Sequence, residues 1–411
     1  MISRIAKLLV ETTGATQLAS AQRLRATDVT LVLGDDCDLV LARSAVALTL
    51  RCFTGNTNVR GANGRLAQAL AHGLQDEATE YGCIDRLVLD GAATGVSLGL
   101  GCSVGDTFVD PRGWFVSVNE ASGKGGPVSA PAAAFAASAG VAKLFAALIG
   151  RDSAVLRESW TAPMLDLAID YPGASASLDL GRVMVIGAGA IGSGFAHVLR
   201  NSPWRAHVVL VDKQRYDEPN HETTLLVSKE TTKRQAPKAA ALAERLRSTS
   251  VSVEPVEAKV DEGHALLTRP VDALVCAVDN PELRCLLDDT AARVVFNAGV
   301  GGTREDAGMV LWTRHRRGEL PLSAHYRRQV EPSGTVEGGP TDVVTDECSR
   351  ISYQQVSLAA PFLGLAAGAL LAAGLVQEAL GMEAPANYMK FDLLGLQQWT
   401  TQGSWRRRPA A

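Results

Sequence analysis

A glycine-rich turn between two apolar segments constrains the fold of this 411-residue chain more than any other feature. Residues 183–192 read VMVIGAGAIG, and residues 208–212 read VVLVD. An apolar strand, a GxGxxG turn, a helix and a second strand ending in an acidic residue are typical of a nucleotide-binding βαβ unit. The sequence therefore predicts an α/β protein with a Rossmann-like domain.

Each glycine of this turn has a distinct expected role. Gly187 permits the tight turn, Gly189 lets backbone N–H groups approach a phosphate, and Gly192 lets the helix pack closely against the strand. Asp212 lies at the end of the second strand and suits a ribose hydroxyl. The motif alone fits both a hydride-transfer enzyme and an enzyme that uses ATP.

Composition excludes several other classes of protein. A chain with 46% hydrophobic and 20% charged residues has the composition of a globular protein, and a net charge of -4 gives no reason to expect nucleic acid. The seven cysteines are scattered without CxxC spacing, which indicates neither a disulfide framework nor a zinc site. Met1–Ser20 lacks the apolar core of a signal peptide, so we expect a cytoplasmic protein.

An uncharged run at Val356–Val376 is long enough to cross a bilayer. It is dominated by Ala and Gly, has no aromatic belt, and resembles another expected helix of this chain that carries Lys143 in its apolar stretch. We therefore expect a buried helix and no membrane partner.

Two stretches of the chain share a plan of glycine-rich turn, short strand and small-residue helix. The simplest account is two related α/β halves, and the alternative is chance similarity between Ala-rich helices. The compared segments are residues 101–105, 113–118 and 131–150 in the first stretch and 298–302, 308–313 and 361–381 in the second.

The two halves differ where a phosphate would bind. In the first half, the strand Val29–Leu33 is followed by Gly34-Asp35-Asp36 in place of GxGxxG, and these carboxylates would repel a phosphate. We therefore predict that only the second half binds a nucleotide. The assignment is an inactive adenylation-like half at 1–150, a linker at 151–180, a nucleotide-binding half at 181–381 with a long connection at 315–347, and a tail at 382–411.

Further motifs follow Asp212 in a fixed order. Asn220 comes first, Pro237-Lys238 then opens an expected helix, and Asp279-Asn280 ends an apolar strand. In this order the residues resemble the ThiF, MoeB and HesA proteins and the ubiquitin-activating enzymes. The resemblance extends to about residue 381, and the first half looks like the degenerate partner domain of fused activating enzymes. It is closest to the activating enzymes of bacterial ubiquitin-like conjugation (Bil-type) operons.

The resemblance implies adenylation with ATP and Mg²⁺ of a ubiquitin-like protein that ends in glycine. It also implies thioester formation and transfer to a ubiquitin-conjugating-type enzyme. By resemblance, Asp212 holds the ribose, Asn220 and Lys238 contact the phosphates, Asn280 contributes to nucleotide binding, and Asp279 holds Mg²⁺. A lysine suits a phosphate as a point charge, and a carboxylate is the oxygen ligand that Mg²⁺ prefers.

The chain departs from the family pattern at two positions. Thr223 stands where the family commonly has an arginine, and Gln214 replaces a frequent second acidic residue. A missing arginine removes a charge that neutralises the phosphates. Arg4, Arg215 and Arg234 are candidates to replace it, and the sequence does not choose among them.

Cys348 is the predicted nucleophile of the thioester step. It follows the long connection 315–347 and begins the last helix, where the helix dipole and Arg350 favour the thiolate. The alternative is a packed cysteine at a helix cap. Cys276 and Cys285 lie in apolar surroundings and are expected in the core.

Three other functions fit the same motifs. One is a ThiF-type enzyme that adenylates a sulfur-carrier protein or peptide without forming a thioester. The second is an NAD-dependent oxidoreductase, which the glycine motif and Asp212 would serve equally well. The third is a pseudoenzyme scaffold, to which Thr223 lends support. Monomer and homodimer are both open.

Overall fold

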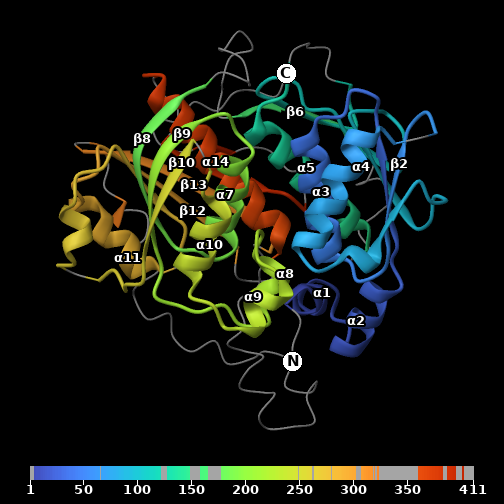
Figure 1. Cartoon of the computed structure of the whole chain (residues 1–411), viewed down its shortest axis with the longest axis horizontal. Coiled ribbons are helices and arrows are strands. Elements are labelled where there is room, and N and C mark those ends of the chain that lie inside the picture. Colours follow the sequence, from blue (N-terminus) through green and yellow to red (C-terminus); the bar gives the residue numbers. More distant parts are fainter. Residues whose placement is uncertain are drawn as a thin grey trace.

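Two α/β halves lie side by side in the computed structural model of the chain (Figure 1). In each half, helices cover a mixed sheet. The residues described are 4–64, 66–121, 127–148, 158–164, 177–248, 250–261, 263–278, 280–301, 307–317, 319, 322–323, 360–382, 387–394 and 400–401.

The first half contains a seven-stranded sheet in the order β3-β2-β1-β4-β5-β6-β7. Strands β1 to β5 pair in parallel, and β6 and β7 are antiparallel additions. Its strands are β1 (Val29–Leu33), β2 (Thr57–Gly61), β3 (Leu87–Leu89), β4 (Val96–Leu100), β5 (Thr107–Val109), β6 (Phe115–Val118) and β7 (Trp160–Pro163). Its helices are α1 (Arg4–Thr13), α2 (Gln17–Arg25), α3 (Leu39–Cys52), α4 (Gln68–Glu80), η1 (Ile84–Arg86) and α5 (Ala130–Leu148).

The second half contains an eight-stranded sheet in the order β10-β9-β8-β11-β12-β13-β14-β15. Its strands are β8 (Asp179–Ile186), β9 (Arg205–Val211), β10 (Val251–Val256), β11 (Ala273–Cys276), β12 (Val294–Val300), β13 (Met309–Arg316), β14 (Tyr388–Asp392) and β15 (Thr400–Thr401). Its helices are α7 (Ala190–Arg200), α8 (Asn220–Thr223), α9 (Lys229–Lys233), α10 (Lys238–Leu246), η3 (Ala265–Thr268), α11 (Pro281–Leu286), η4 (Leu287–Asp289) and α14 (Pro361–Ala379).

The two sheets repeat one topology. In each sheet the first strand, β1 or β8, is flanked by the next two strands on one side and by two further parallel strands on the other. Antiparallel strands then extend both sheets beyond β5 and β12. This matching order supports two related halves over chance similarity between Ala-rich helices.

The prediction that the glycine-rich turns at 101–105 and 298–302 occupy equivalent positions in the two halves was wrong. Residues 101–105 connect β4 to β5, whereas the second turn begins within β12, whose last residues are 298–300 and which corresponds to β5. The turns therefore lie one strand apart in the repeated plan. Small residues recur at many strand ends, so their presence alone does not identify equivalent positions.

Two predicted connecting segments contribute strands. Within the linker 151–180, β7 pairs with β6, and within the tail 382–411, β14 pairs with β13. In β14 the apolar Met389 and Phe391 alternate with more exposed neighbours, the pattern of a strand with one buried face. The connection predicted at 315–347 also begins inside β13, which continues to Arg316.

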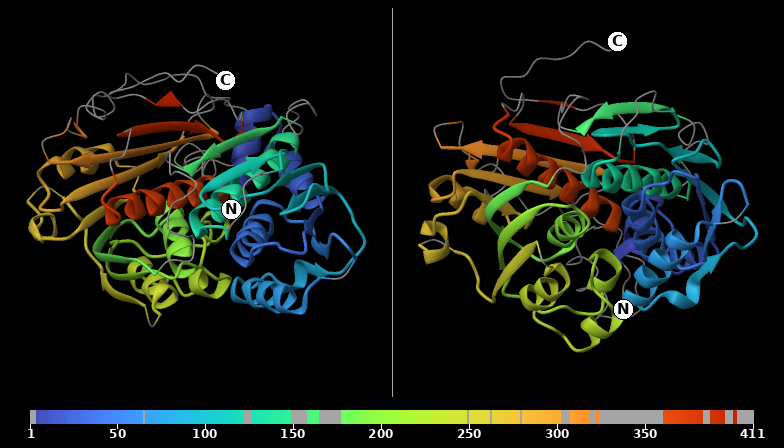
Figure 2. Two further views of the ribbon diagram at one scale, coloured as in Figure 1. Left: turned by 90° about the horizontal axis from the view of Figure 1, so that it is seen from above. Right: turned by 45° about the horizontal axis from the view of Figure 1, so that its top comes forward.

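Four helices, α3, α5, α7 and α14, form the centre of the molecule. In Figure 2 the red α14 and the teal α5 lie side by side near the middle, and Phe145 meets Phe362 there with ring centroids 5.6 Å apart. One continuous apolar core runs through both halves. The most apolar windows of α5 and α14 are long enough to cross a membrane, yet 89% of each is buried within the protein. The described part of the uncharged run is thus a buried helix.

Glycines allow α7 and α14 to pack backbone against backbone. A Cβ added to Gly368 of α14 would lie 2.2 Å from the backbone nitrogen of Phe195 in α7. A Cβ added to Gly194 of α7 would lie 2.4 Å from the carbonyl oxygen of Gly364. Since α7 follows the glycine-rich turn, this packing fixes the position of the turn relative to the core.

Candidate functional site

The glycine-rich turn has the backbone geometry that a close phosphate approach requires. Gly187 has φ +104°, and a Cβ there would lie 2.7 Å from the Val278 side chain. A Cβ on Gly192 would lie 2.0 Å from the carbonyl oxygen of Gly187, so the helix begins tightly against the turn. At Gly189 no atom of the described residues lies within 4 Å of the Cβ position, which leaves this corner of the turn open among them.

The N-terminus of α7 differs from that of α3 in the first half. Gly189 is the N-cap of α7, and none of the described side chains caps this end. In α3 the Asp38 carboxylate accepts hydrogen bonds from Val40 N at 2.8 Å and Leu41 N at 3.1 Å. A helix N-terminus attracts anions through its amides and dipole. In α3 a carboxylate already occupies that position, whereas in α7 the position is open.

Asp212 and Tyr216 hold the glycine-rich turn from behind. The two Asp212 carboxylate oxygens accept hydrogen bonds from Ala188 N and Gln214 N, each at 2.8 Å. The Tyr216 hydroxyl donates to the Ala188 carbonyl at 2.7 Å, and burial raises the pKa of this phenol. Tyr216 was not predicted, and its signal was only an aromatic residue near Asp212. Each carboxylate oxygen of Asp212 can accept a further hydrogen bond, so a ribose contact is compatible with its backbone contacts.

Helix α8 brings Asn220 and Thr223 into the interior. The Asn220 side-chain oxygen accepts a hydrogen bond from Asp217 N at 3.1 Å, which closes the turn before the helix. Thr223 is buried, and its hydroxyl has no hydrogen-bond partner among the described residues. The position at which relatives commonly carry arginine therefore holds a small buried side chain.

The loop after α8 contains a strained residue. Leu226 is buried and has φ +59°, a left-handed conformation that costs a bulky residue roughly 1–3 kcal/mol. Its neighbour Leu225 donates its backbone N–H to the Ser193 hydroxyl of α7 at 2.9 Å. The loop is thus tied directly to the helix that follows the glycine-rich turn.

Lys238 begins α10 beside the same site. Its ammonium group donates to the Gln214 side-chain oxygen at 2.9 Å and lies 5.7 Å from the centre of the Tyr216 ring. Its backbone N–H donates to the Gln214 carbonyl at 2.8 Å. Gln214 therefore orients the lysine without adding a negative charge beside it.

The carboxyl end of β11 is organised by a residue that the sequence analysis missed. The Arg284 guanidinium donates to the Val278 carbonyl through Nη2 at 2.7 Å and also contacts the Ala298 carbonyl at 3.4 Å. Asn280 caps α11 by accepting from Leu283 N at 3.1 Å. Asp279, between these contacts, lies outside the described residues. Among the residues described, no group of three or more His, Cys, Asp or Glu could hold a metal ion.

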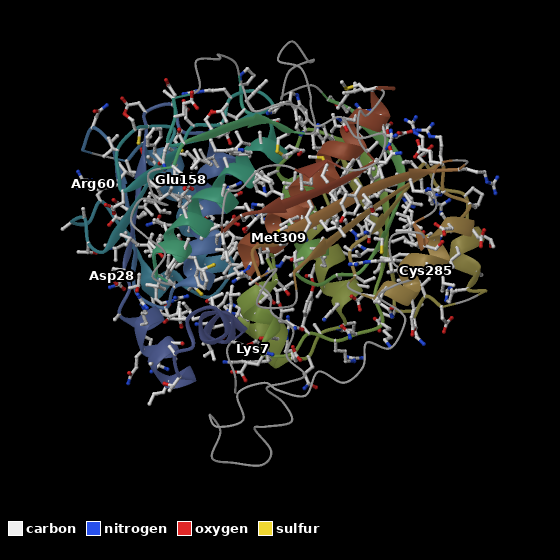
Figure 3. The ribbon with its side chains drawn as sticks, turned by 180° about the vertical axis from the view of Figure 1, so that it is seen from behind. Lys7, Asp28, Arg60, Glu158, Cys285 and Met309 are labelled. Carbon is white, nitrogen blue, oxygen red and sulfur yellow. The ribbon has the colours of Figure 1, made fainter. Side chains whose placement is uncertain are left out.

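The structure places some of the predicted cysteines and arginines. Cys276 is buried as expected, whereas Cys285 is only half-buried, on α11 at the outer end of the second half (Figure 3). Cys348 and most of the connection 315–347 lie outside the described residues. Arg215 donates to the Gln235 carbonyl at 3.1 Å, and the exposed Arg234 pairs with Glu230 at 3.6 Å. Arg4 begins α1, which packs against α8.

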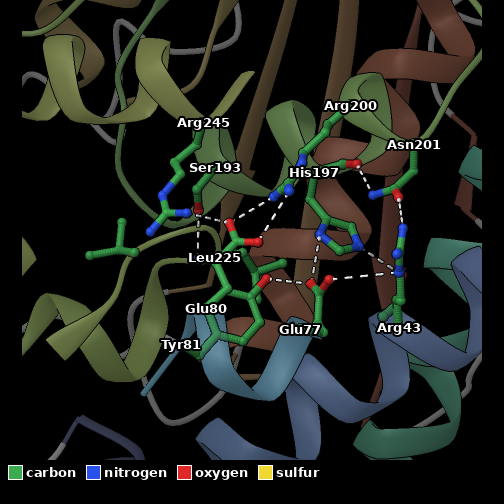
Figure 4. A network of polar contacts seen from close by, with 12 residues as sticks. Arg43, Glu77, Glu80, Tyr81, Ser193, His197, Arg200, Asn201, Leu225 and Arg245 are labelled. Atoms are coloured by element: carbon green, nitrogen blue, oxygen red, sulfur yellow. Dashed lines mark hydrogen bonds and ion pairs between the residues drawn. The ribbon is translucent and has the colours of Figure 1, made fainter. Parts of the chain in front are cut away.

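A polar network joins the halves behind the site (Figure 4). Glu80 of α4 forms ion pairs with Arg200 at 2.8 Å and Arg245 at 3.0 Å. Deeper in the boundary, His197 lies 3.0 Å from the Ser44 hydroxyl and 3.9 Å from Glu77. Ser44, His197 and Glu77 together have the composition of a hydrolytic triad. All three residues are buried, however, and burial lowers the pKa of His197 to about 3, so the set acts as a structural contact.

Comparisons with known proteins find similarity over the half that contains the site. Residues 181–382 match the BilD C-terminal domain model. The sulfur carrier protein ThiS adenylyltransferase of Bacillus subtilis (strain 168) is 30% identical over 125 residues, which cover 30% of this chain and 37% of that protein.

Solved structures show more distant similarity. E. coli MccB with ATP has a TM-score of 0.42 and 16% identity, covering 55% of this chain and 64% of that one. PaaA has a TM-score of 0.39 and 15% identity, covering 54% and 64%. The chain thus spans less than two thirds of each of these relatives.

Proposed function

We infer that the chain belongs to the ThiF and ubiquitin-activating-enzyme-like adenylation superfamily, with residues 181–382 matching the BilD C-terminal domain. From this premise we propose that it activates a ubiquitin-like protein of a Bil system by adenylating the protein's C-terminal glycine with ATP. The activated protein then forms a thioester with Cys348 and passes to a ubiquitin-conjugating-type enzyme. This step distinguishes the proposal from simple adenylation.

The open N-terminus of α7 carries the proposal. Its glycine-rich turn is held by Asp212 and Tyr216, and the Lys238 ammonium group lies 5.7 Å from the centre of the Tyr216 ring. Backbone amides and an ammonium group thus flank Tyr216, which supports a site for triphosphate charge. The absence of a capping side chain leaves the helix end to an anionic ligand. A site of this kind neutralises charge and positions reactants, which is most of what adenylation requires.

The proposed reaction proceeds in two steps. A carboxylate oxygen of the ubiquitin-like protein attacks the α-phosphorus of ATP, and the bond between the α-phosphorus and the bridging oxygen breaks to release pyrophosphate. The Cys348 thiolate then attacks the acyl carbon, and AMP leaves. Lys238 and the α7 amides would stabilise the developing phosphate charge. Mg²⁺ held by Asp279 would supply further charge neutralisation when bound, and Asn220 and Asn280 would complete the nucleotide contacts.

The first half has features of a partner that binds no nucleotide. Asp38 occupies the end of α3 that corresponds to the open end of α7, and Asp35 and Asp36 lie exposed beside it. A phosphate there would meet carboxylates instead of free amides. This contrast supports one ATP site per chain, in the second half.

Two alternatives rank lower. Adenylation of a sulfur-carrier protein without thioester transfer shares the first step and would not require Cys348, and the similarity to the ThiS adenylyltransferase favours it as the second candidate. An oxidoreductase is less favoured, because the matching curated relative is an adenylyltransferase. A cytoplasmic location and either a monomer or a homodimer complete the proposal.

Replacing Cys348 with Ala is expected to separate the two proposed steps. With ubiquitin-like proteins ending in glycine, the variant should keep ATP–pyrophosphate exchange, because adenylation does not use the thiol, and should lose a reductant-sensitive adduct on gels. Cys285→Ala is the matched control and should keep both. An adduct that persists in Cys348→Ala would contradict the assignment of the nucleophile, and exchange without any adduct in the native chain would favour simple adenylation.

A further inference from the structure

The α8 segment of the second half lies against the first half. Helix α8 contacts both α1 and α3, and Figure 1 shows it at the boundary between the halves. The segment carries Asn220, and the strained Leu226 follows in the loop 224–228. Contacts from the first half therefore bear directly on a predicted ATP contact.

Two hydrogen bonds cross this boundary on either side of Leu226. The His221 Nε2 atom donates to the Tyr81 carbonyl at 3.1 Å, and burial together with the nearby Arg51 charge lowers the pKa of this histidine to about 3. The Arg51 Nη2 atom donates to the Val227 carbonyl at 2.8 Å. The chain is thus held by the first half before and after its strained residue.

Arg51 is itself rigidly placed. It lies at the C-terminal end of α3, is only 4% exposed, and its guanidinium stacks 4.1 Å from the centre of the Tyr81 ring. The Tyr81 hydroxyl donates to Glu77 at 2.7 Å. Arg86 caps the end of α3 by donating to the Phe53 carbonyl at 2.8 Å. These contacts fix the direction in which Arg51 meets Val227.

A contribution to stability does not explain why a buried arginine occupies position 51. Its Nε and Nη1 atoms have no hydrogen-bond partner among the described residues, although the side chain is buried. Burying unpaired guanidinium N–H groups is unfavourable, and an apolar side chain would fill the space without that penalty. The contact with Val227 gives the arginine a role that an apolar residue could not take.

We propose that Arg51 of the first half is a positioning residue for the ATP site of the second half. By holding the Val227 carbonyl, it keeps Leu226 in its left-handed conformation and holds α8 where Asn220 can meet the phosphates. This inference rests on the proposed adenylation function. It gives the first half a part in ATP binding without a nucleotide site of its own.

Arg51→Met tests the proposal, because methionine keeps the apolar stem and removes the donor. In ATP–pyrophosphate exchange the KM for ATP should rise roughly 10- to 100-fold, the scale expected when a supporting contact lets a binding group shift by about 1 Å. In the free protein, amide hydrogen exchange in the loop 224–228 should become faster. Arg51→Lys should restore part of both properties, since its ammonium group can donate to the same carbonyl.

Glu80→Gln is the matched control. It weakens the ion pairs with Arg200 and Arg245 across the same boundary without touching α8. It should lower the melting temperature and leave the KM for ATP unchanged. If Arg51→Met also lowers the melting temperature and leaves the KM for ATP unchanged, Arg51 is only structural and the proposal is overturned.

The amide-exchange measurement separates this inference from the proposed function. If the native chain does not bind ATP, the adenylation proposal fails. Faster amide exchange at 224–228 in Arg51→Met would still establish that the contact between Arg51 and the Val227 carbonyl holds this loop. Unchanged amide exchange at 224–228 in Arg51→Met would overturn the proposed role of Arg51, whether or not the native chain binds ATP. If Arg51→Met does not fold, Tyr81→Leu carries the same comparison, because it removes the ring that supports the guanidinium.

Discussion

Replacing Gly189 with Asp is expected to abolish ATP binding and leave the protein folded. The backbone at Gly189 has φ −84° and ψ −151°, and nothing lies within 4 Å of its Cβ position, so a side chain fits. The new carboxylate would cap α7 as Asp38 caps α3. It would occupy the helix amides and repel the phosphates, converting the second half to the arrangement of the first.

The expected loss of ATP affinity in Gly189→Asp follows from the repulsion between the new carboxylate and the phosphates. Two unit charges about 4 Å apart near a protein surface repel by roughly 4 kcal/mol, which corresponds to a loss of affinity of about 1,000-fold. Replacing a glycine N-cap by Asp changes helix stability by only a few tenths of a kcal/mol. Isothermal titration with ATP should therefore show a loss of at least about 100-fold at an unchanged or slightly higher melting temperature. Gly189→Ala is the control that adds a Cβ without a charge. An affinity of Gly189→Asp for ATP equal to that of the native chain would contradict the placement of the ATP site at the N-terminus of α7.

Replacing Gly368 with Ala is expected to destabilise the whole molecule. The added Cβ would lie 2.2 Å from the backbone nitrogen of Phe195, and neither helix backbone can yield without moving its neighbours in the core. Overpacking of this kind is expected to cost roughly 3 kcal/mol or more. The better helix propensity of alanine returns only about 1 kcal/mol. The net loss should be about 2 kcal/mol or more, and α7 should shift with its glycine-rich turn.

Urea unfolding measures this loss as a lower midpoint at an unchanged slope. Gly73→Ala in α4 is the matched control, because the atoms nearest its added Cβ are the ends of the Leu39 and Arg43 side chains. These flexible ends can move, so the control should stay within about 1 kcal/mol of the native chain. Equal stability of the two variants would show that the contact between α7 and α14 is not tight.

The sequence predicted the features that depend on local chemistry. The conformations of Gly187 and Gly192 follow from the steric demands of a strand–turn–helix unit, and the structure has that geometry. The burial of α14 could be predicted because the uncharged run lacks the aromatic belt that marks a membrane span. A repeated architecture could be inferred because each half needs the same alternation of strands and helices.

Features that depend on long-range placement were missed or misassigned. Strand β14 has a readable alternation at Met389 and Phe391, but only the partner strand β13 shows that the tail completes the second sheet. The contact of Arg51 with Val227 joins residues 176 positions apart, and no local pattern indicates it. The two glycine-rich turns were equated by composition, although composition does not say which strand precedes a turn.

The most direct test of the account is the fate of the α-phosphate of ATP. The purified Cys348→Ala chain, in which no thiol displaces AMP from the adenylate, should be mixed with a ubiquitin-like protein ending in glycine and with ATP labelled at either the α- or the γ-phosphorus. The protein-bound label should be counted after a rapid acid quench. The account predicts transfer of the α-label, but not the γ-label, to the ubiquitin-like protein, and none in Gly189→Asp. Absence of α-label on any such protein, together with stoichiometric binding of NAD, would contradict it.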